Sequence, residues 1–188
     1  AKKLGYVWCA GIESGGATGW AATDWLEEYV LRYGGVDQYN KWWKGQIKFD
    51  SPLVTKAGNT VAAHLLSAGA ANGGGKGLAA TSFGNTAALF STDKNKCFMM
   101  RQGSFITGFF PEDVQADLDN KVGVFGLPSA DGNPAPVEGG GDLSVLMTDN
   151  PAAAQVLNMF TDPSVGIPAA AASSHSPSLG SRAPAQRA

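Results

Sequence analysis

The segment 11–25 places two indole rings and two carboxylates close together, in the sequence GIESGGATGWAATDW. Trp20 and Trp25 flank Asp24, and Glu13 lies earlier in the same glycine-rich stretch. An indole plane can stack on the C–H face of a sugar ring, and carboxylate oxygens accept hydrogen bonds from its hydroxyls. The segment could therefore bind a sugar. Because large aromatic side chains are mostly buried, two tryptophans that anchor a core are the alternative.

Each of these side chains has a structural alternative to a role in binding. Trp20 is the residue that we expect to stack on a sugar ring, but a loop tryptophan could also close the top of the core. Asp24 could accept hydrogen bonds from hydroxyls or cap the start of a helix. Glu13 is either a further acceptor or a solvated loop carboxylate. Trp25 falls on one helical stripe with Tyr29, which favours a place in the core.

A second polar group follows the apolar run at residues 97–100. The planar guanidinium of Arg101 could bridge adjacent hydroxyls, hold a carboxylate in place or form a structural salt bridge. Gln102 and Ser104 add neutral donors and acceptors beside it. These three residues are the second set of candidates for a polar ligand.

The residues do not combine into catalytic machinery. A hydrolase of glycosidic bonds needs two opposed carboxyl groups, and Glu13 with Asp24 is the pair to consider, but nothing marks either as the proton donor. His64 and His175 lie in contexts that do not support a Ser-His-Asp arrangement. The glycine-rich stretch 72–77 lacks the ending of a phosphate-binding loop and is predicted to be a linker. We expect no cofactor, no metal site and no enzymatic activity.

The elements that must position these residues alternate between strands and helices. Four apolar segments are predicted to be buried strands: residues 6–12, 97–100, 122–127 and 143–147. Helices are predicted over 22–31, with Thr23 or Asp24 as the cap, then over 36–44, 85–90 and 151–160, and from Ser51-Pro52 to about residue 70. A helical or turn segment is expected over 103–110. Of Trp42 and Trp43, one is expected in the core and one at the surface.

Composition bounds the class of protein. The 188 residues are 44% hydrophobic and 16% charged, with 25 glycines, which fits an α/β domain with many tight loops. A net charge of −2 gives no electrostatic reason to bind nucleic acid or an anionic membrane. No apolar run is long enough to span a bilayer. From residue 163 onward Ala, Ser, Pro and Arg dominate, so we expect a lobe over 1–162 and a disordered tail over 163–188.

Cys9 and Cys97 each lie in an apolar, strand-like segment and are expected to be buried. They are either two inert thiols or the two halves of one disulfide. Two cysteines are too few for a disulfide scaffold, and no cluster of Cys and His suggests zinc.

Several separated segments carry a resemblance to a known family. They are Trp8-Cys9, residues 11–20, 23–25, 48–52, Phe83-Gly84, residues 97–105 and residues 140–142. In this order they resemble the extracellular solute-binding proteins of carbohydrate ABC transporters, and among these the α-glucoside-binding branch. The resemblance extends from about residue 4 to residue 168.

The resemblance implies an α/β receptor of the type II periplasmic-binding-protein class, in which two lobes close over an oligosaccharide. This chain would be a partial receptor, mainly the second lobe. The segment 140–142 would line the cleft near the hinge, where glycine lets the backbone approach the ligand and Asp142 accepts from hydroxyls, with Gly141 beside it. Similar proteins have cysteines at both positions here, so the resemblance favours a disulfide between Cys9 and Cys97.

The resemblance also implies partners and a location. The protein would be a monomer that binds an oligosaccharide and passes it to the permease subunits of an ABC transporter. It would be periplasmic or extracellular and peripheral to the membrane, held there through a leader that is absent from this chain. A truncated receptor cannot close over its ligand, so we expect weak binding at most, and a fragment that binds nothing is the alternative.

Overall fold

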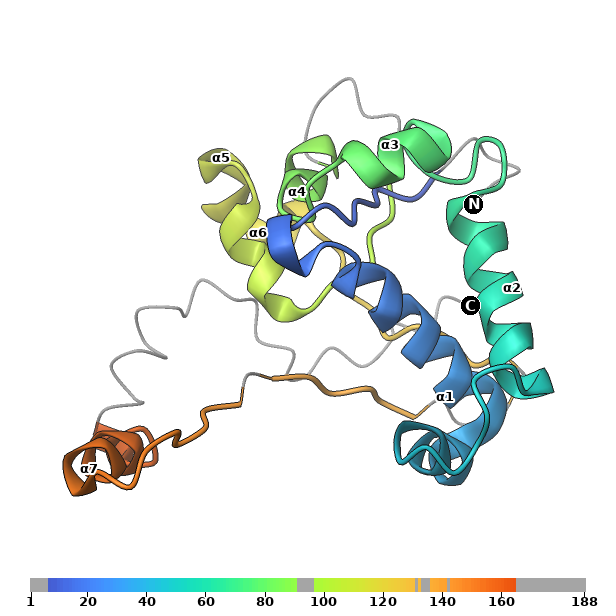
Figure 1. Cartoon of the computed structure of the whole chain (residues 1–188). Coiled ribbons are helices and arrows are strands. Elements are labelled where there is room, and N and C mark those ends of the chain that lie inside the picture. Colours follow the sequence, from blue (N-terminus) through green and yellow to red (C-terminus); the bar gives the residue numbers. More distant parts are fainter. Residues whose placement is uncertain (1–6, 91–96, 131, 133–135, 142, 165–188) are drawn as a thin grey trace.

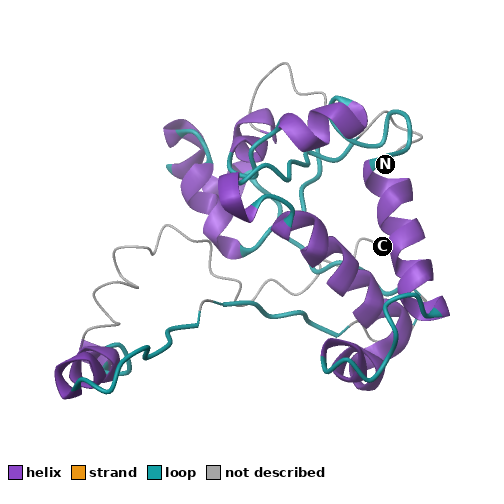
Figure 2. Cartoon of the chain, viewed as in Figure 1, coloured by secondary structure: helices purple, strands orange, loops and turns teal. Residues whose placement is uncertain are grey.

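The computed structural model describes residues 7–90, 97–130, 132, 136–141 and 143–164 (Figure 1). Helices and loops account for these residues, and no extended sheet forms among them (Figure 2). The elements are η2 (Gly15–Ala17), α1 (Trp20–Trp43), α2 (Pro52–Leu65), α3 (Gly74–Ala80), α4 (Asn85–Phe90), η3 (Ser104–Phe109), α5 (Glu112–Gln115), α6 (Leu118–Lys121) and α7 (Pro151–Met159).

The predicted α/β architecture is only partly met, because the first predicted strand forms isolated parallel bridges. Trp8 bridges to Ala71 on one side and to Met99 on the other, and Glu13 bridges to Ser82. The Trp8 N–H donates to the Ala70 carbonyl at 2.8 Å. The segment 7–13 therefore lies between two parallel segments, as a central strand would, but each pairing is too short to count as a strand.

Two of the predicted strands are wrong. Residues 122–127 and 143–147 are irregular, and most of their apolar side chains are exposed: Phe125 is 71% and Leu143 is 92% accessible, whereas Val122 and Leu127 are partly buried against the cores. The sequence pattern identifies side chains that are apolar, but apolar character is not enough to bury them. Burial of a strand also requires a neighbour that supplies backbone hydrogen bonds, and no such neighbour occurs among the described residues.

Helix α1 bends at Gly34 and Gly35, between the two helices predicted over 22–31 and 36–44. Gly35 has φ of 70°, a left-handed value that glycine adopts without steric cost, and it separates the two helical stretches within α1. The predicted cap at Thr23 or Asp24 is wrong, since the helix begins at Trp20 after Gly19. Asp24 therefore lies one turn inside the helix, where its carboxylate does not serve as a cap.

The main core lies between α1 and α2, which run side by side (Figure 1). Trp25 is buried as predicted, and its ring contacts Trp8 edge-on at 4.8 Å between centroids. Trp42 packs against this core while Trp43 is exposed, also as predicted. The buried members of the core are Ala10, Trp25, Tyr29, Val30, Val54, Ala57, Leu65, Ala71 and Leu78.

Helix α2 begins as the sequence indicates but ends earlier. The Ser51 hydroxyl accepts from the Val54 N–H at 3.5 Å, and Pro52 occupies the first helical position. The helix ends at Leu65 rather than near residue 70, because Ala70 is drawn into the pairing with Trp8. The start of α2 depends on neighbouring residues in sequence, whereas its end depends on the distant segment that carries Trp8.

The glycine-rich stretch 72–77 is not a linker, as the sequence had suggested, but the start of α3. The Asn72 side-chain oxygen accepts from the Ala10 N–H at 2.7 Å, which ties this stretch to the central segment. A β-carbon on Gly77 would lie 2.5 Å from the Asn72 carbonyl oxygen. Glycine is needed here because the backbone approaches itself closely.

We expect Gly77→Ala to lower the free energy of unfolding by about 1–3 kcal/mol, because the new methyl meets backbone that cannot yield. Gly75→Ala is the matched control within α3, since its nearest neighbour is the Leu66 side chain at 3.8 Å. Better helix propensity should make that variant more stable by up to about 1 kcal/mol. Urea denaturation of both variants checks the prediction, and equal shifts in the same direction would contradict it.

Cys9 and Cys97 form a disulfide, in agreement with the pairing that the resemblance favours. Both are buried, and their Cα atoms are 5.1 Å apart. The bond joins the central segment to the segment that carries Arg101. It therefore fixes the two parts of the chain from which the candidate site is built.

The carboxyl-terminal part is less packed. Helix α7 begins at Pro151 as predicted, with the Asn150 side chain accepting from the Ala152 N–H at 2.9 Å. It contains no buried residue and lies away from the other helices (Figure 1). The predicted tail begins at residue 163, and all of it after Ser164 lies outside the described residues. Within the described part, none of the helices has both the length and the apolar character that crossing a membrane requires.

Candidate functional site

The candidate residues lie at the carboxyl ends of the parallel segments. The central segment 7–13 leads into η2 and then to Trp20 and Asp24, while the segment that pairs at Met99 leads directly to Arg101. In open parallel sheets, ligands bind outside the carboxyl ends of the strands. The isolated bridges thus deliver both candidate groups to the edge where a ligand site is expected.

Four aromatic rings meet at this edge and form what we call the aromatic surface: Trp20, Phe83, Phe105 and Phe109. The Trp20 ring lies 5.1 Å from Phe83 and 5.8 Å from Phe105, centroid to centroid. Phe105 and Phe109 are about half exposed, and Trp20 is partly exposed. Trp20 therefore does not plug the core but contributes to an accessible apolar face.

Arg101 is the centre of an ionic group that we call the Arg101 cluster: Asp24, Glu28, Arg101 and Glu138. Its Nη2 donates to Glu138 Oε2 at 2.8 Å and to Glu28 Oε2 at 3.0 Å. Its Nη1 lies 3.3 Å from Asp24 Oδ2. Of the roles open to Arg101, the structure shows the one in which it holds carboxylates.

Helix α1 connects the two groups. Trp20, Asp24 and Glu28 follow one another at intervals of four residues, so their side chains lie along one face of the helix. Trp20 belongs to the aromatic surface and the other two belong to the Arg101 cluster. The helix therefore places a flat apolar ring next to carboxylates, which is the pairing that sugar recognition requires.

Arg32 continues this line of side chains and anchors the segment that carries Glu138. Its Nη2 lies 2.8 Å from Glu28 Oε1 and donates a hydrogen bond to the Leu127 carbonyl at 2.6 Å. Its Nη1 donates to the Pro136 carbonyl at 3.0 Å. Arg32 is buried, so these contacts satisfy a charge that would otherwise be costly to enclose.

Burial and neighbouring charge shift the pKa values in the cluster. Burial, together with a hydrogen bond to Glu28, raises the pKa of Glu138 from 4.5 to about 8, although Arg101 acts in the opposite direction. Burial by itself would lower the pKa of Arg101, but Glu138, Glu28 and Asp24 outweigh it and raise that pKa. The guanidinium thus stays charged, while Glu138 changes its charge within the physiological range.

Some buried polar atoms of the Arg101 cluster and of Arg32 form no hydrogen bond within this group of residues. Arg32 Nε and Arg101 Nε are buried without a hydrogen-bond partner among the described residues, whereas Glu28 Oε1 is engaged by the ion pair with Arg32 at 2.8 Å. Buried polar atoms are nearly always paired in folded proteins. The two unpaired nitrogens are donors that solvent or a polar ligand could use.

The structure brings together some of the predicted site residues. Asp24 and Arg101 form an ion pair, and Gln102 joins Arg101 in lining a small enclosed cavity of about 10 Å³. Ser104 begins η3 and is exposed, next to the aromatic surface. The assignment of these residues to a ligand site stays a prediction.

Other predicted residues are not joined to the site by any described contact. The Glu13 carboxylate accepts from the Gly15 N–H at 2.8 Å, so it is used within its own loop. Gly141 is exposed and follows Glu138 by three residues. Asp142 lies outside the described residues. Their roles also stay predictions.

Five residues of the site were missed as individual candidates: Glu28, Glu138, Phe83, Phe105 and Phe109. Glu28 could have been found, because it follows Asp24 by one helical turn. Phe83 and Phe105 occur in the segments that carry the family resemblance. Glu138 gave no local signal, since only the folded chain brings it to Arg101, 37 positions away in sequence.

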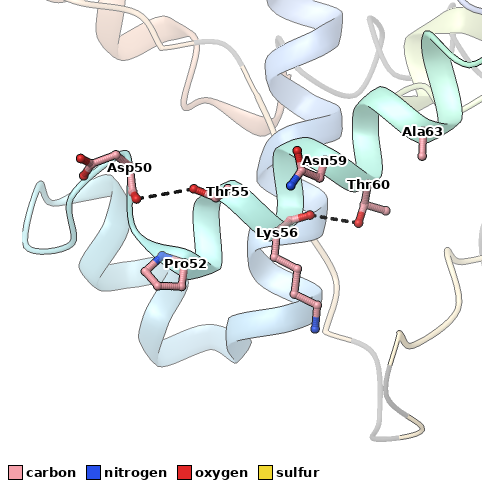
Figure 3. A pocket seen from close by; sticks show the side chains of 7 residues that line it. All are labelled: Asp50, Pro52, Thr55, Lys56, Asn59, Thr60 and Ala63. Atoms are coloured by element: carbon pink, nitrogen blue, oxygen red, sulfur yellow. Dashed lines mark hydrogen bonds between the residues drawn. The ribbon is translucent and has the colours of Figure 1, made fainter.

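A second concave surface lies along α2 and has no connection with the two groups (Figure 3). Its volume is about 730 Å³, and it is lined by Asp50, Pro52, Thr55, Lys56, Asn59, Thr60 and Ala63. The Thr60 hydroxyl donates to the Lys56 carbonyl, and the Lys56 ammonium lies 4.0 Å from the centroid of the Tyr33 ring. These groups are already engaged along the helix, so we do not place the candidate site here.

Two curated proteins are similar to this chain over most of its length. One is the osmoprotective compounds-binding protein GgtB of Synechocystis sp., which is 35% identical over 151 residues, or 80% of this chain and 35% of that protein. The other is the alpha-glucosides-binding periplasmic protein AglE of Rhizobium meliloti, which is 36% identical over 163 residues, or 83% of this chain and 34% of that protein. The chain is similar to substrate-binding proteins.

The chain spans about a third of the length of these two relatives. No model of a known protein family matches it, and no solved structure matches it. The similarity therefore concerns one continuous part of a binding protein, and the activity of such a protein as a whole is a matter for proposal.

Proposed function

We propose that this chain belongs to the substrate-binding component of an ABC importer, which binds an α-glucoside or a related oligosaccharide and delivers it to the membrane permease. The observation that carries the proposal is the aromatic surface beside the Arg101 cluster, in a chain that is similar to two solute-binding proteins. One relative is named for α-glucosides and the other for osmoprotective compounds. An α-glucoside as the ligand is therefore a more specific proposal than binding of a small solute.

In the proposed complex a glucosyl ring stacks on Trp20 and lies against Phe105. Its hydroxyls donate to the Asp24 carboxylate and accept from Arg101 Nη1. Asp24 suits this role because it is the most exposed carboxylate of the Arg101 cluster, with 35% of its side chain accessible. Gln102, Ser104 and the segment 140–142 extend the same site.

The proposal includes the wider architecture. Residues 1–162 would form part of a type II periplasmic-binding-protein lobe, and residues 163–188 a disordered tail. The buried disulfide suits a protein that works outside the cytoplasm, in the periplasm or at the cell exterior. Association with the membrane would come from the permease.

A glycoside hydrolase is the function that we set aside. Asp24 is the counter-ion of a guanidinium, and Glu13 accepts from a backbone N–H. A hydrolase needs one carboxyl group that donates a proton to the leaving oxygen. Both relatives are named as binding proteins.

The 188-residue chain should bind trehalose, maltose or sucrose weakly. A micromolar receptor complex corresponds to about −8 kcal/mol, and half of that leaves a Kd of roughly 1 mM. Saturation-transfer NMR detects binding of this strength. Trp20→Ala should abolish the signal, whereas Trp43→Ala, which removes an exposed tryptophan from the far end of α1, should preserve it. Absence of saturable binding for all three sugars would remove the proposal, and micromolar affinity would refute the expected weakness.

A further inference from the structure

We propose that Glu28 and Glu138 are positioning residues: they hold Nη2 of Arg101, so that Nη1 and the Asp24 carboxylate face the ligand. This inference rests on the proposed function, since it assigns a role in sugar binding to groups that would not touch the sugar. The proposal treats the two terminal nitrogens of Arg101 differently: Nη2 is occupied by the glutamates, and Nη1 is available to a ligand.

The contacts of the two nitrogens differ in kind. Nη2 donates hydrogen bonds to both glutamates, whose side chains are 8% and 14% exposed for Glu28 and Glu138. Among the described residues, the contact of Nη1 is an ion pair with Asp24 at 3.3 Å, and Asp24 is the most exposed of the three acids. A hydroxyl both donates and accepts, so a sugar hydroxyl could join Nη1 to Asp24 without disturbing Nη2.

The two glutamates come from different parts of the chain. Glu28 projects from α1, where Arg32 pairs with it from the next turn. Glu138 lies on an irregular segment that Arg32 holds two residues earlier, at the Pro136 carbonyl. The orientation of Arg101 therefore depends on that segment staying attached to α1, because Glu138 can contact Arg101 only while the segment is attached.

Protonation of Glu138 should control how firmly Arg101 is held. The groups that face Glu138 are Arg101, Glu28 and, through a longer-range interaction, Tyr39, which also feels Glu27 and Asp24. Burial and Glu28 raise the pKa of Glu138 from 4.5 to about 8, so the contribution of this group to the stability of the fold is complete below pH 4.5 and is lost as the pH rises through about 8. Arg101 acts in the opposite direction and lowers that pKa, so a charged Glu138 holds the guanidinium more firmly than a protonated one.

Glutamine reproduces the protonated state, since its amide also donates to one neighbour and accepts from another. Glu138→Gln should therefore keep Arg101 in place at every pH, and Glu138→Ala should release it. Glu112→Ala is the matched control, because Glu112 is exposed in the first turn of α5. Far-ultraviolet circular dichroism confirms that each variant is folded.

The first measurement needs no sugar. In the ligand-free chain below pH 7, restricted rotation of the Arg101 guanidinium should give separate Nη1 and Nη2 signals in ¹⁵N NMR. The signals should merge in Glu138→Ala and stay separate in Glu138→Gln and Glu112→Ala. Separate signals in folded Glu138→Ala would overturn the proposal. If Glu138→Ala does not fold, merged signals in Glu138→Gln would overturn it equally.

The second measurement titrates trehalose, which has no ionisable group. Affinity of the unmodified chain should rise several-fold as the pH rises through about 8, because the charged Glu138 holds Arg101 more firmly, and Glu138→Gln should show no such rise. Identical pH profiles for the two proteins would overturn the positioning role. Failure of trehalose, maltose and sucrose to bind at any pH would instead remove the proposed function, and the guanidinium signals would still decide whether the glutamates position Arg101.

Discussion

Arg101→Met should lower the free energy of unfolding by about 3 kcal/mol, which is the lower part of the range for breaking a buried ion pair. Arg101 is the shared partner of Asp24, Glu28 and Glu138, and only 16% of its side chain is exposed. Methionine fills a similar volume but leaves the acids without their counter-charge. The partial exposure of Asp24 moderates the loss.

The pH dependence separates this effect from a simple loss of packing. Without Arg101 the charged carboxylates repel one another, so lowering the pH should restore stability to Arg101→Met as protons neutralise them. Adding Glu138→Gln to Arg101→Met should restore part of the stability as the pH rises to about 8 and above, where Glu138 would otherwise become charged and repel the other acids. Urea denaturation across the range from pH 4.5 to about 8 measures both recoveries.

Lys121→Met is the matched control, because Lys121 forms an ion pair with Asp113 at 2.9 Å on an exposed surface. Surface pairs contribute little, so this change should shift stability by less than about 1 kcal/mol. Equal losses in Arg101→Met and Lys121→Met, or a loss in Arg101→Met that does not vary with pH, would show that the Arg101 cluster is not a buried electrostatic unit.

Features that depend on local chemistry were predictable from the sequence. The Ser51-Pro52 and Asn150-Pro151 pairs each open a helix, because a side-chain oxygen satisfies a free N–H and proline fits the first turn. The adjacent glycines at 34 and 35 mark the bend in α1 for a similar reason. The helix over Asn85–Phe90 also has its predicted bounds.

Features that depend on distant partners were harder to predict. The segments 122–127 and 143–147 have the composition of strands, but composition does not supply the neighbour that a strand needs. The stretch 72–77 looked like a linker because glycine loosens a free chain. Its glycines instead allow the close approach that Gly77 makes to Asn72, which becomes visible only when the segment is packed.

The candidate site divides in the same way. Trp20 and Asp24 were identified together because an indole and a carboxylate lie close in sequence, and the structure then places them on adjacent turns of one helix. Arg101 was identified as a polar residue after an apolar run, but its role was left open, since Glu28 is 73 positions away in sequence. Glu138 was missed because nothing near it in sequence distinguishes it. Side-chain types can suggest a class of ligand, but only the folded chain shows which charged groups contact one another.

Loss of the Cys9–Cys97 disulfide should lower the free energy of unfolding by about 4–5 kcal/mol, because the bond closes a long loop in the unfolded chain. The two cysteines are 88 positions apart, and the cost of opening such a loop is close to the whole stability of many domains, about 5–15 kcal/mol. Urea denaturation with and without a thiol reductant measures the effect. Replacing both cysteines by alanine gives the control, since a reductant should not change that variant further.

Reduction should also affect the site before the chain unfolds completely. The central segment carries Cys9 and leads to Asp24, while the segment with Cys97 leads to Arg101 within four residues. The disulfide therefore fixes the distance over which Asp24 and Arg101 pair at 3.3 Å. Below the unfolding midpoint, reductant should weaken trehalose binding and merge the guanidinium signals of Arg101. Unchanged binding and unchanged stability after complete reduction, verified by thiol titration, would show that packing alone holds the two segments together.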